Sequence, residues 1–149
     1  MRSMKLKDAG SKLLTASPLF RQLRIPEFAI LLFIRRKVKM PVHGAKEQIT
    51  QAILAWEGVT AQPHRFGGTE YRLGRREIGH IHGDYLVDIP FPKKVRDEII
   101  AAGRAEPHHI LPDSGWISFY LREPADIEQA IGLFRQSFEL AVKQRQKQD

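Results

Sequence analysis

Two histidines two residues apart, His80 and His82, are the side chains of this sequence with the clearest chemical potential. We expect them on a β-strand, where residues i and i+2 leave the same face of a sheet, and strict alternation would put Ile78 beside them. Imidazole titrates near neutral pH, so such a pair can donate and accept protons, with Asp84 or Asp88 to orient a ring. His80, His82 and Asp84 are therefore the predicted catalytic residues.

Further candidates for ligand binding surround this pair. Arginine forks suit phosphate or carboxylate groups, and Gly67-Gly68 would let a ligand approach the backbone closely. An aromatic side chain could stack on a ligand. The alternatives are a solvated strand edge whose arginines are neutralised by interleaved acids, and an aromatic face that packs beneath a helix. The predicted ligand-binding residues are His64, Arg65, Arg72, His108, His109 and Trp116.

A metal could be bound only if histidines from different segments meet. His64, or one of the pair at 108–109, could add a third imidazole to those of His80 and His82, and three is the number of protein ligands at an open zinc or iron site. A carboxylate could come from Glu70, Asp84 or Asp88. The spacings lack the compact regularity of metal motifs, so the sequence predicts no metal and specifies no cofactor. It also contains no phosphate-binding glycine loop, dinucleotide fingerprint or nucleophile elbow.

Hydrophobic periodicity and turn residues predict the elements that position these side chains. Four short strands should form an antiparallel meander, followed by a helix, an irregular loop, a fifth strand and a last helix, with one more helix in front. The expected ranges are a helix around 49–56, the meander over 59–89, a helix over 92–103, the loop over 104–114, a strand over 116–121 and a helix from 124. This order predicts an α+β fold, an antiparallel sheet of about five strands with helices on one face.

Charge divides the chain of 149 residues at about position 43. Residues 1–43 carry ten Lys or Arg against two acids, a net charge of +8, whereas residues 44–149 carry fourteen against fifteen, a net of −1. We expect a basic arm at 1–43 and one α+β domain at 44–149. The arm could hold an anionic membrane surface or a nucleic acid.

The same arm contains an apolar run at 28–34, far shorter than the ~20 residues of a membrane-spanning helix. We expect the run to pack on the domain or on a second copy of the chain, as a homo-oligomer, with a peripheral membrane anchor as the alternative. The chain has no cysteine, which excludes disulfides and thiolate chemistry. We expect a cytoplasmic protein, with a peripheral place at a membrane as the alternative.

Three runs of sequence carry a family resemblance: 64–84 around the paired histidines, 87–92 (Val-Asp-Ile-Pro-Phe-Pro) and 104–116 around His108-His109. Over about Trp56 to Phe138 the chain resembles a small bacterial family of luciferase-domain proteins. Flavin-dependent luciferases are (β/α)₈ barrels of about 250 residues, so the resemblance does not imply that fold or any set of catalytic residues. The resulting prediction is a module that binds a small ligand or a partner, and the alternative is a small enzyme that uses the histidine cluster.

Overall fold

The computed structural model describes residues 41–147, so the predicted arm and its apolar run lie almost entirely outside the described residues. The described elements are α2 (Ala45–Leu54), β1 (Val59–Pro63), β2 (Thr69–Leu73), β3 (Arg76–His82), β4 (Leu86–Pro90), α3 (Lys93–Ala101), β5 (Glu106–Pro107), β6 (Trp116–Tyr120) and α4 (Ala125–Gln146). Among these residues no helix is long and apolar enough to cross a membrane.

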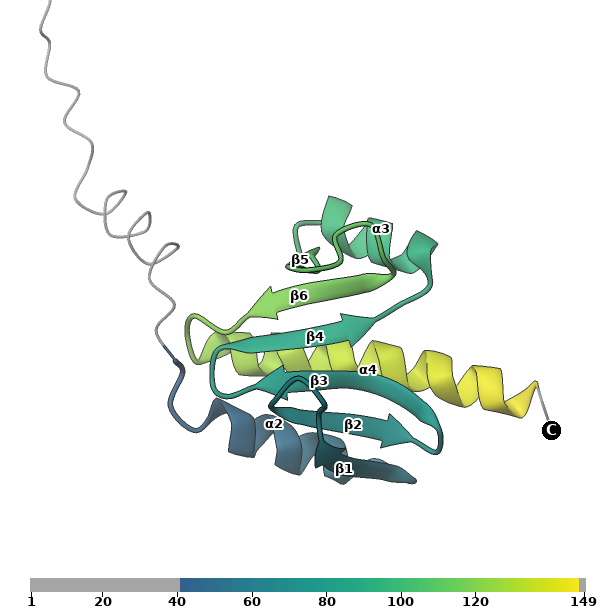
Figure 1. Cartoon of the computed structure of the whole chain (residues 1–149), viewed down its shortest axis with the longest axis horizontal. Helices are drawn as coiled ribbons and strands as arrows, with labels where there is room; N and C mark the ends of the chain where they lie inside the picture. Colours follow the sequence, from purple (N-terminus) through teal and green to yellow (C-terminus); the bar gives the residue numbers. More distant parts are fainter. Residues whose placement is uncertain (1–40, 148–149) are drawn as a thin grey trace, which may run out of the picture.

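The described strands form one six-stranded sheet in the order β1-β2-β3-β4-β6-β5, and every neighbouring pair is antiparallel. Figure 1 shows α4 lying across one face of this sheet, with α2 beside it and α3 near β6. This arrangement confirms the predicted α+β class. The sixth strand, the two-residue β5, lies in the segment expected to be an irregular loop.

The hydrophobic core fills the space between the sheet and α4, as the apolar stripes predict. On α4 the side chains of Ile127, Phe134 and Phe138 are buried, and on α2 those of Ile49 and Ile53. Burying such side chains contributes about 1.5–3 kcal/mol each. The core therefore holds one face of the sheet against the helices and leaves the other face free to carry polar groups.

A β-bulge in β3 changes which side chains share a face. Tyr71 is opposite Gly79 and Arg72 is opposite Glu77, so Ile78 has no partner on β2. Gly79 has φ 139°, and a Cβ there would lie 2.5 Å from the Phe134 ring of α4. Only glycine fits this position.

The bulge corrects one expectation about the histidine face. Ile78 is fully buried in the core instead of lying beside His80 and His82. Glu77 takes its place, because the extra residue puts Glu77 on the same face as His80 although the two are three positions apart. Strict alternation was wrong here.

Val42 is buried in the core, and its N–H donates to the carbonyl of Asp84 at 2.8 Å. The Asp84 carboxylate accepts from the amides of Gly44 at 3.3 Å and Lys46 at 2.8 Å, at the start of α2. A carboxylate in this place satisfies amides that have no partner within the helix. The turn between β3 and β4 is thereby fixed to α2.

Candidate functional site

Five of the six histidines converge on one pocket of about 670 Å³, on the face of the sheet opposite α4. His80 and His82 come from β3, His64 from the end of β1, and His108 and His109 from the segment after β5. Glu77, Asp88 and Trp116 line the same pocket. The predicted common face of His80 and His82 is therefore present, and the loop histidines meet them.

Asp88 lies at the centre of the cluster. It is completely buried on β4, where it pairs in register with His80 on one side and with Ser118 of β6 on the other. The Ser118 hydroxyl donates to Asp88 Oδ1 at 2.5 Å. The other oxygen, Oδ2, is buried without a hydrogen bond.

Three imidazole nitrogens surround that unpaired Oδ2. The Nε2 atoms of His82, His80 and His108 lie 3.3, 3.4 and 3.7 Å from it. These distances exceed the 2.7–2.9 Å of a charge-assisted hydrogen bond. A buried carboxylate oxygen that accepts no hydrogen bond needs an explanation, because nearly all buried polar atoms in folded proteins are hydrogen-bonded.

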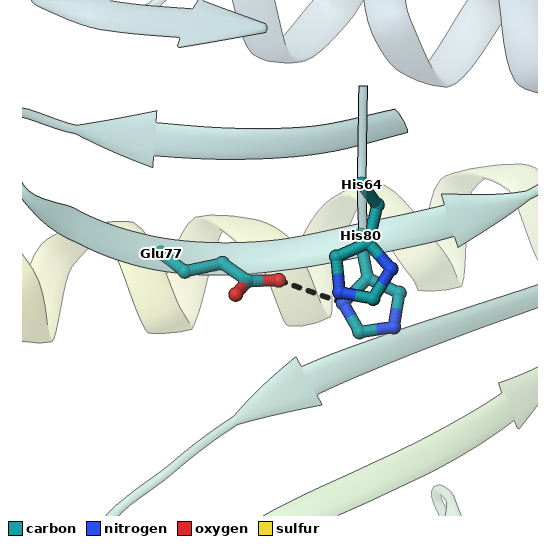
Figure 2. A group of neighbouring side chains, drawn as sticks. All are labelled: His64, Glu77 and His80. Atoms are coloured by element: carbon teal, nitrogen blue, oxygen red, sulfur yellow. Dashed lines mark hydrogen bonds and ion pairs between the residues drawn. The ribbon is translucent and has the colours of Figure 1, made fainter. Parts of the chain in front are cut away.

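Hydrogen bonds fix the ring orientations at the periphery of the cluster. His80 Nδ1 bonds Glu77 Oε1 at 2.7 Å, and the ring of His80 stacks on that of His64 with centroids 3.9 Å apart. Figure 2 shows the overlap of the two rings and the contact with Glu77. His108 Nδ1 accepts from the amides of Ile110 and Leu111. That contact uses the lone pair of Nδ1, so a neutral His108 carries its proton on Nε2.

Charges in the pocket follow from these contacts. Burial by itself would lower the pKa of His80, but Asp88 and Glu77 on its two sides outweigh it and raise that pKa to about 9. Burial would raise the pKa of Asp88, yet His80 and the Ser118 hydroxyl lower it. Burial and the neighbouring His80 lower the pKa of His82. The free pocket thus contains a His80–Asp88 ion pair beside a neutral His82 at neutral pH.

The mouth of the pocket is apolar. Phe66 is 75% exposed, Ile110 70% and Leu111 55%, although all three are large hydrophobic side chains. Tyr85, 38% exposed, also lines the pocket. Arg65 adds a cation at the same rim and stacks over the Phe66 ring at 4.7 Å.

The structure brings together most of the residues predicted from the sequence. His64, Arg65, Trp116 and the pair at 108–109 line the pocket with His80 and His82. Arg72 does not, because it pairs with Glu70 at 2.9 Å. Asp84 does not either, since its carboxylate is bonded at the start of α2.

Glu77 and Ser118 were not predicted as site residues from the sequence. Asp88 was predicted only as one of several possible acids. One signal could have found Asp88, namely a carboxylate in the middle of the apolar strand 86–90. A charge in such a strand is costly unless it has partners. Ser118, between Ile117 and Phe119 of β6, carries the same signal in weaker form.

Comparison with known proteins gives one match to a described family, over part of the chain. Residues 75–137 match the family model of the Luciferase domain. The resemblance predicted from the sequence is confirmed over this range, which we call the Luciferase-domain segment. No curated protein and no solved structure matches the chain. The Luciferase-domain segment contains His80, His82, Asp88 and the pair at 108–109, whereas His64 precedes it.

Proposed function

We propose that this domain binds a small organic molecule in the histidine-lined pocket. The observation that supports the proposal is the convergence of five imidazoles and Asp88 on one pocket of about 670 Å³. That volume falls within the range of about 300–1,000 Å³ typical of small-molecule sites. Isolated histidines that only fill surface niches would have no reason to converge.

The distribution of side chains around the pocket defines the chemistry of the molecule. Apolar residues at the mouth, among them Phe66 and Ile110, favour an aliphatic or aromatic body. Imidazoles and carboxylates at the floor favour a polar group at one end, and Arg65 favours negative charge near the rim. The ligand we propose is therefore amphipathic, with its polar end next to His82 and Asp88.

A dye that also combines an apolar body with a polar end tests this proposal. Anilinonaphthalene sulfonate becomes fluorescent in apolar surroundings, and its sulfonate can reach Arg65 or the imidazoles. Phe66→Ser and Ile110→Ser should each weaken its binding about 3- to 10-fold, because each removes an apolar contact worth about 1 kcal/mol. Leu54→Ser is the matched control, since Leu54 is 45% exposed on α2 and does not line the pocket.

Dye bound elsewhere on the full chain contributes equally to all of these variants. Weaker binding by the two mouth variants and unchanged binding by Leu54→Ser would support the proposal. Equal binding by the wild type and the mouth variants would refute it.

A second candidate is a small enzyme that acts on the bound molecule. It is favoured by the orphaned Asp88 Oδ2, because buried polar atoms without partners gather at functional sites. Small esters, aldehydes and hydroxy acids that displace the dye can be incubated with the wild type and with His82→Ala, then analysed by mass spectrometry. Conversion by the wild type alone supports an enzyme, and full recovery of each compound supports a binding module.

The basic arm supports a separate proposal about a partner. We propose that residues 1–43 hold the domain at an anionic surface, since they carry a net charge of +8 while the rest of the chain is close to neutral. Each Lys or Arg near an anionic bilayer contributes about 1 kcal/mol. The small-molecule pocket would then work beside that surface.

A further inference from the structure

Asp88 Oδ2, which accepts no hydrogen bond, lies at the spacing of metal ligands from two imidazole nitrogens. Zinc lies about 2.0–2.1 Å from imidazole nitrogen and about as far from carboxylate oxygen, so ligand atoms at a tetrahedral zinc are about 3.3 Å apart. The Nε2 atoms of His82 and His80 lie 3.3 and 3.4 Å from Asp88 Oδ2. The three ligand atoms lie within 4.8 Å of one another.

Ring orientation supports this set of ligands. The imidazoles of His80 and His82 are nearly perpendicular, at 88°, with centroids 4.9 Å apart. Two rings at that angle can both aim an in-plane lone pair at one point. His80 Nδ1 is engaged by Glu77 at 2.7 Å, which leaves Nε2 unprotonated and turned toward Asp88 when the ring is neutral. A carboxylate in this outer position is the usual partner of a metal-bound histidine.

A second possible ligand group consists of His64, Glu77 and His80. His64 and His80 stack with their ring planes 14° apart and centroids 3.9 Å apart, so their in-plane lone pairs lie in two separate, nearly parallel planes and do not meet at one ion. Figure 2 shows the two rings overlapping. The Glu77 carboxylate, moreover, is already bonded to His80 Nδ1. This group therefore supports the ring of His80 and does not hold an ion itself.

The third group, Asp88 with His108 and His109, fails for a similar reason. His108 Nδ1 accepts two backbone amides, so its Nε2 carries a proton when the ring is neutral. His109 Nδ1 is bonded to the Ser118 hydroxyl at 3.0 Å. Among the three groups that the described residues form, His80, His82 and Asp88 are therefore the set in which each member can offer a lone pair, and the ion displaces the Nε2 proton of His80 when it binds.

From this geometry we infer that His80, His82 and Asp88 bind a divalent first-row transition ion, best matched by Zn²⁺, at the floor of the pocket. Two imidazoles and one carboxylate form an established ligand set for Zn²⁺ and for Fe²⁺. The remaining coordination position faces the pocket. An ion there would hold the polar end of the bound molecule by direct coordination, which goes beyond the proposed binding of an organic ligand.

The test uses the full chain, expressed without a histidine tag and freed of metal with a chelator. Titration with Zn²⁺ is followed by calorimetry, and titration with Co²⁺ by the visible absorption of a tetrahedral Co²⁺ centre. We expect one equivalent per chain. His82→Ala should weaken binding by at least ~100-fold, because removing a ligand costs more than the 10- to 100-fold loss typical of an outer-shell change. Glu77→Gln should fall within that outer-shell range and keep the stoichiometry.

His43→Ala is the matched control, because His43 is an exposed histidine outside the pocket. It should bind like the wild type, and His109→Ala should lose much less affinity than His82→Ala. Circular dichroism checks that each variant folds, and His82 suits this test because 17% of its side chain is exposed, whereas Asp88 is fully buried.

Absence of stoichiometric binding by the wild type would overturn the inference, as would equal binding by the wild type and His82→Ala. A loss in His43→Ala as large as in His82→Ala would also overturn it. The titrations contain no organic ligand and the dye assay needs no metal. Failure of one proposal is therefore distinguishable from failure of the other.

Discussion

Gly79 lies in the bulge that places Glu77 on the same face of β3 as His80. Gly79→Ala therefore tests whether the bulge needs a glycine at this position. The glycine has φ 139°, a region that side-chain-bearing residues adopt at a cost of about 1–3 kcal/mol. A Cβ would also lie 2.5 Å from the Phe134 ring and 2.9 Å from the carbonyl oxygen of Asp88. Overpacking of this kind costs about 1–3 kcal/mol more. We expect the free energy of unfolding to fall by about 2–6 kcal/mol.

Urea unfolding followed by circular dichroism measures this loss, and two other glycines provide controls. Gly74 also has a positive φ, 61°, but a Cβ there would have no atom within 4 Å, so Gly74→Ala should show the backbone cost alone, about 1 kcal/mol. Gly132 lies in α4 with open space around it, and Gly132→Ala should stabilise by about 0.5–1 kcal/mol. A loss in Gly79→Ala no larger than in Gly74→Ala would refute the steric argument.

Three further predictions concern other parts of the chain. Asp84→Ala should cost about 1 kcal/mol in urea unfolding, since it removes a partner of the first amides of α2, while dye and metal binding stay within about twofold; a large loss of either would return Asp84 to the site. Hydrogen bonds from Arg72 and Gln62 outweigh burial and hold the pKa of Glu70 below its ordinary 4.5, so the stability it contributes is present above that value and lost as pH falls through the lowered pKa. Glu70→Gln should therefore be less stable at neutral pH and show a weaker loss of stability toward acid, and parallel pH profiles of the urea midpoint would contradict this. Replacing the four basic residues of 35–39 by Gln in the full chain should weaken binding to phosphatidylserine vesicles at least ~100-fold at low salt, and unchanged sedimentation with the vesicles would remove the arm from the proposal.

The sequence was sufficient for the parts of the fold that depend on local patterns. The turn residues between 59 and 89 predicted the meander. Tight hairpin turns need a positive φ, which favours glycine, so glycines in the sequence mark where the chain turns. The stripe on α4 and the alternation of β6 were confirmed for the same reason. The helix expected around 49–56 ends at Leu54, and Trp56 beyond it is only half-buried against Phe138.

The parts that could not be predicted depend on tertiary contacts. The bulge exists because Gly79 lies against Phe134, a residue far away in sequence, and nothing within β3 reveals that contact. The choice between Asp84 and Asp88 depended on the pairing of β4 with β6, which places Ser118 beside Asp88. His80 and His82 could be paired from spacing alone, whereas Glu77 could not.

The three candidate ligands His80, His82 and Asp88 belong to a single hairpin, β3–β4, while the apolar mouth comes from two separate loops. A connection this short costs little chain entropy to close, so the three side chains are brought together by local pairing, and Ser118 of β6 then fixes the Asp88 carboxylate. In the loops at 64–68 and 108–115, the exposed apolar positions Phe66, Ile110 and Leu111 can then vary while the three candidate ligands keep their places. Selectivity for the proposed organic ligand and affinity for the proposed ion would thus be two separately adjustable properties of the same small domain.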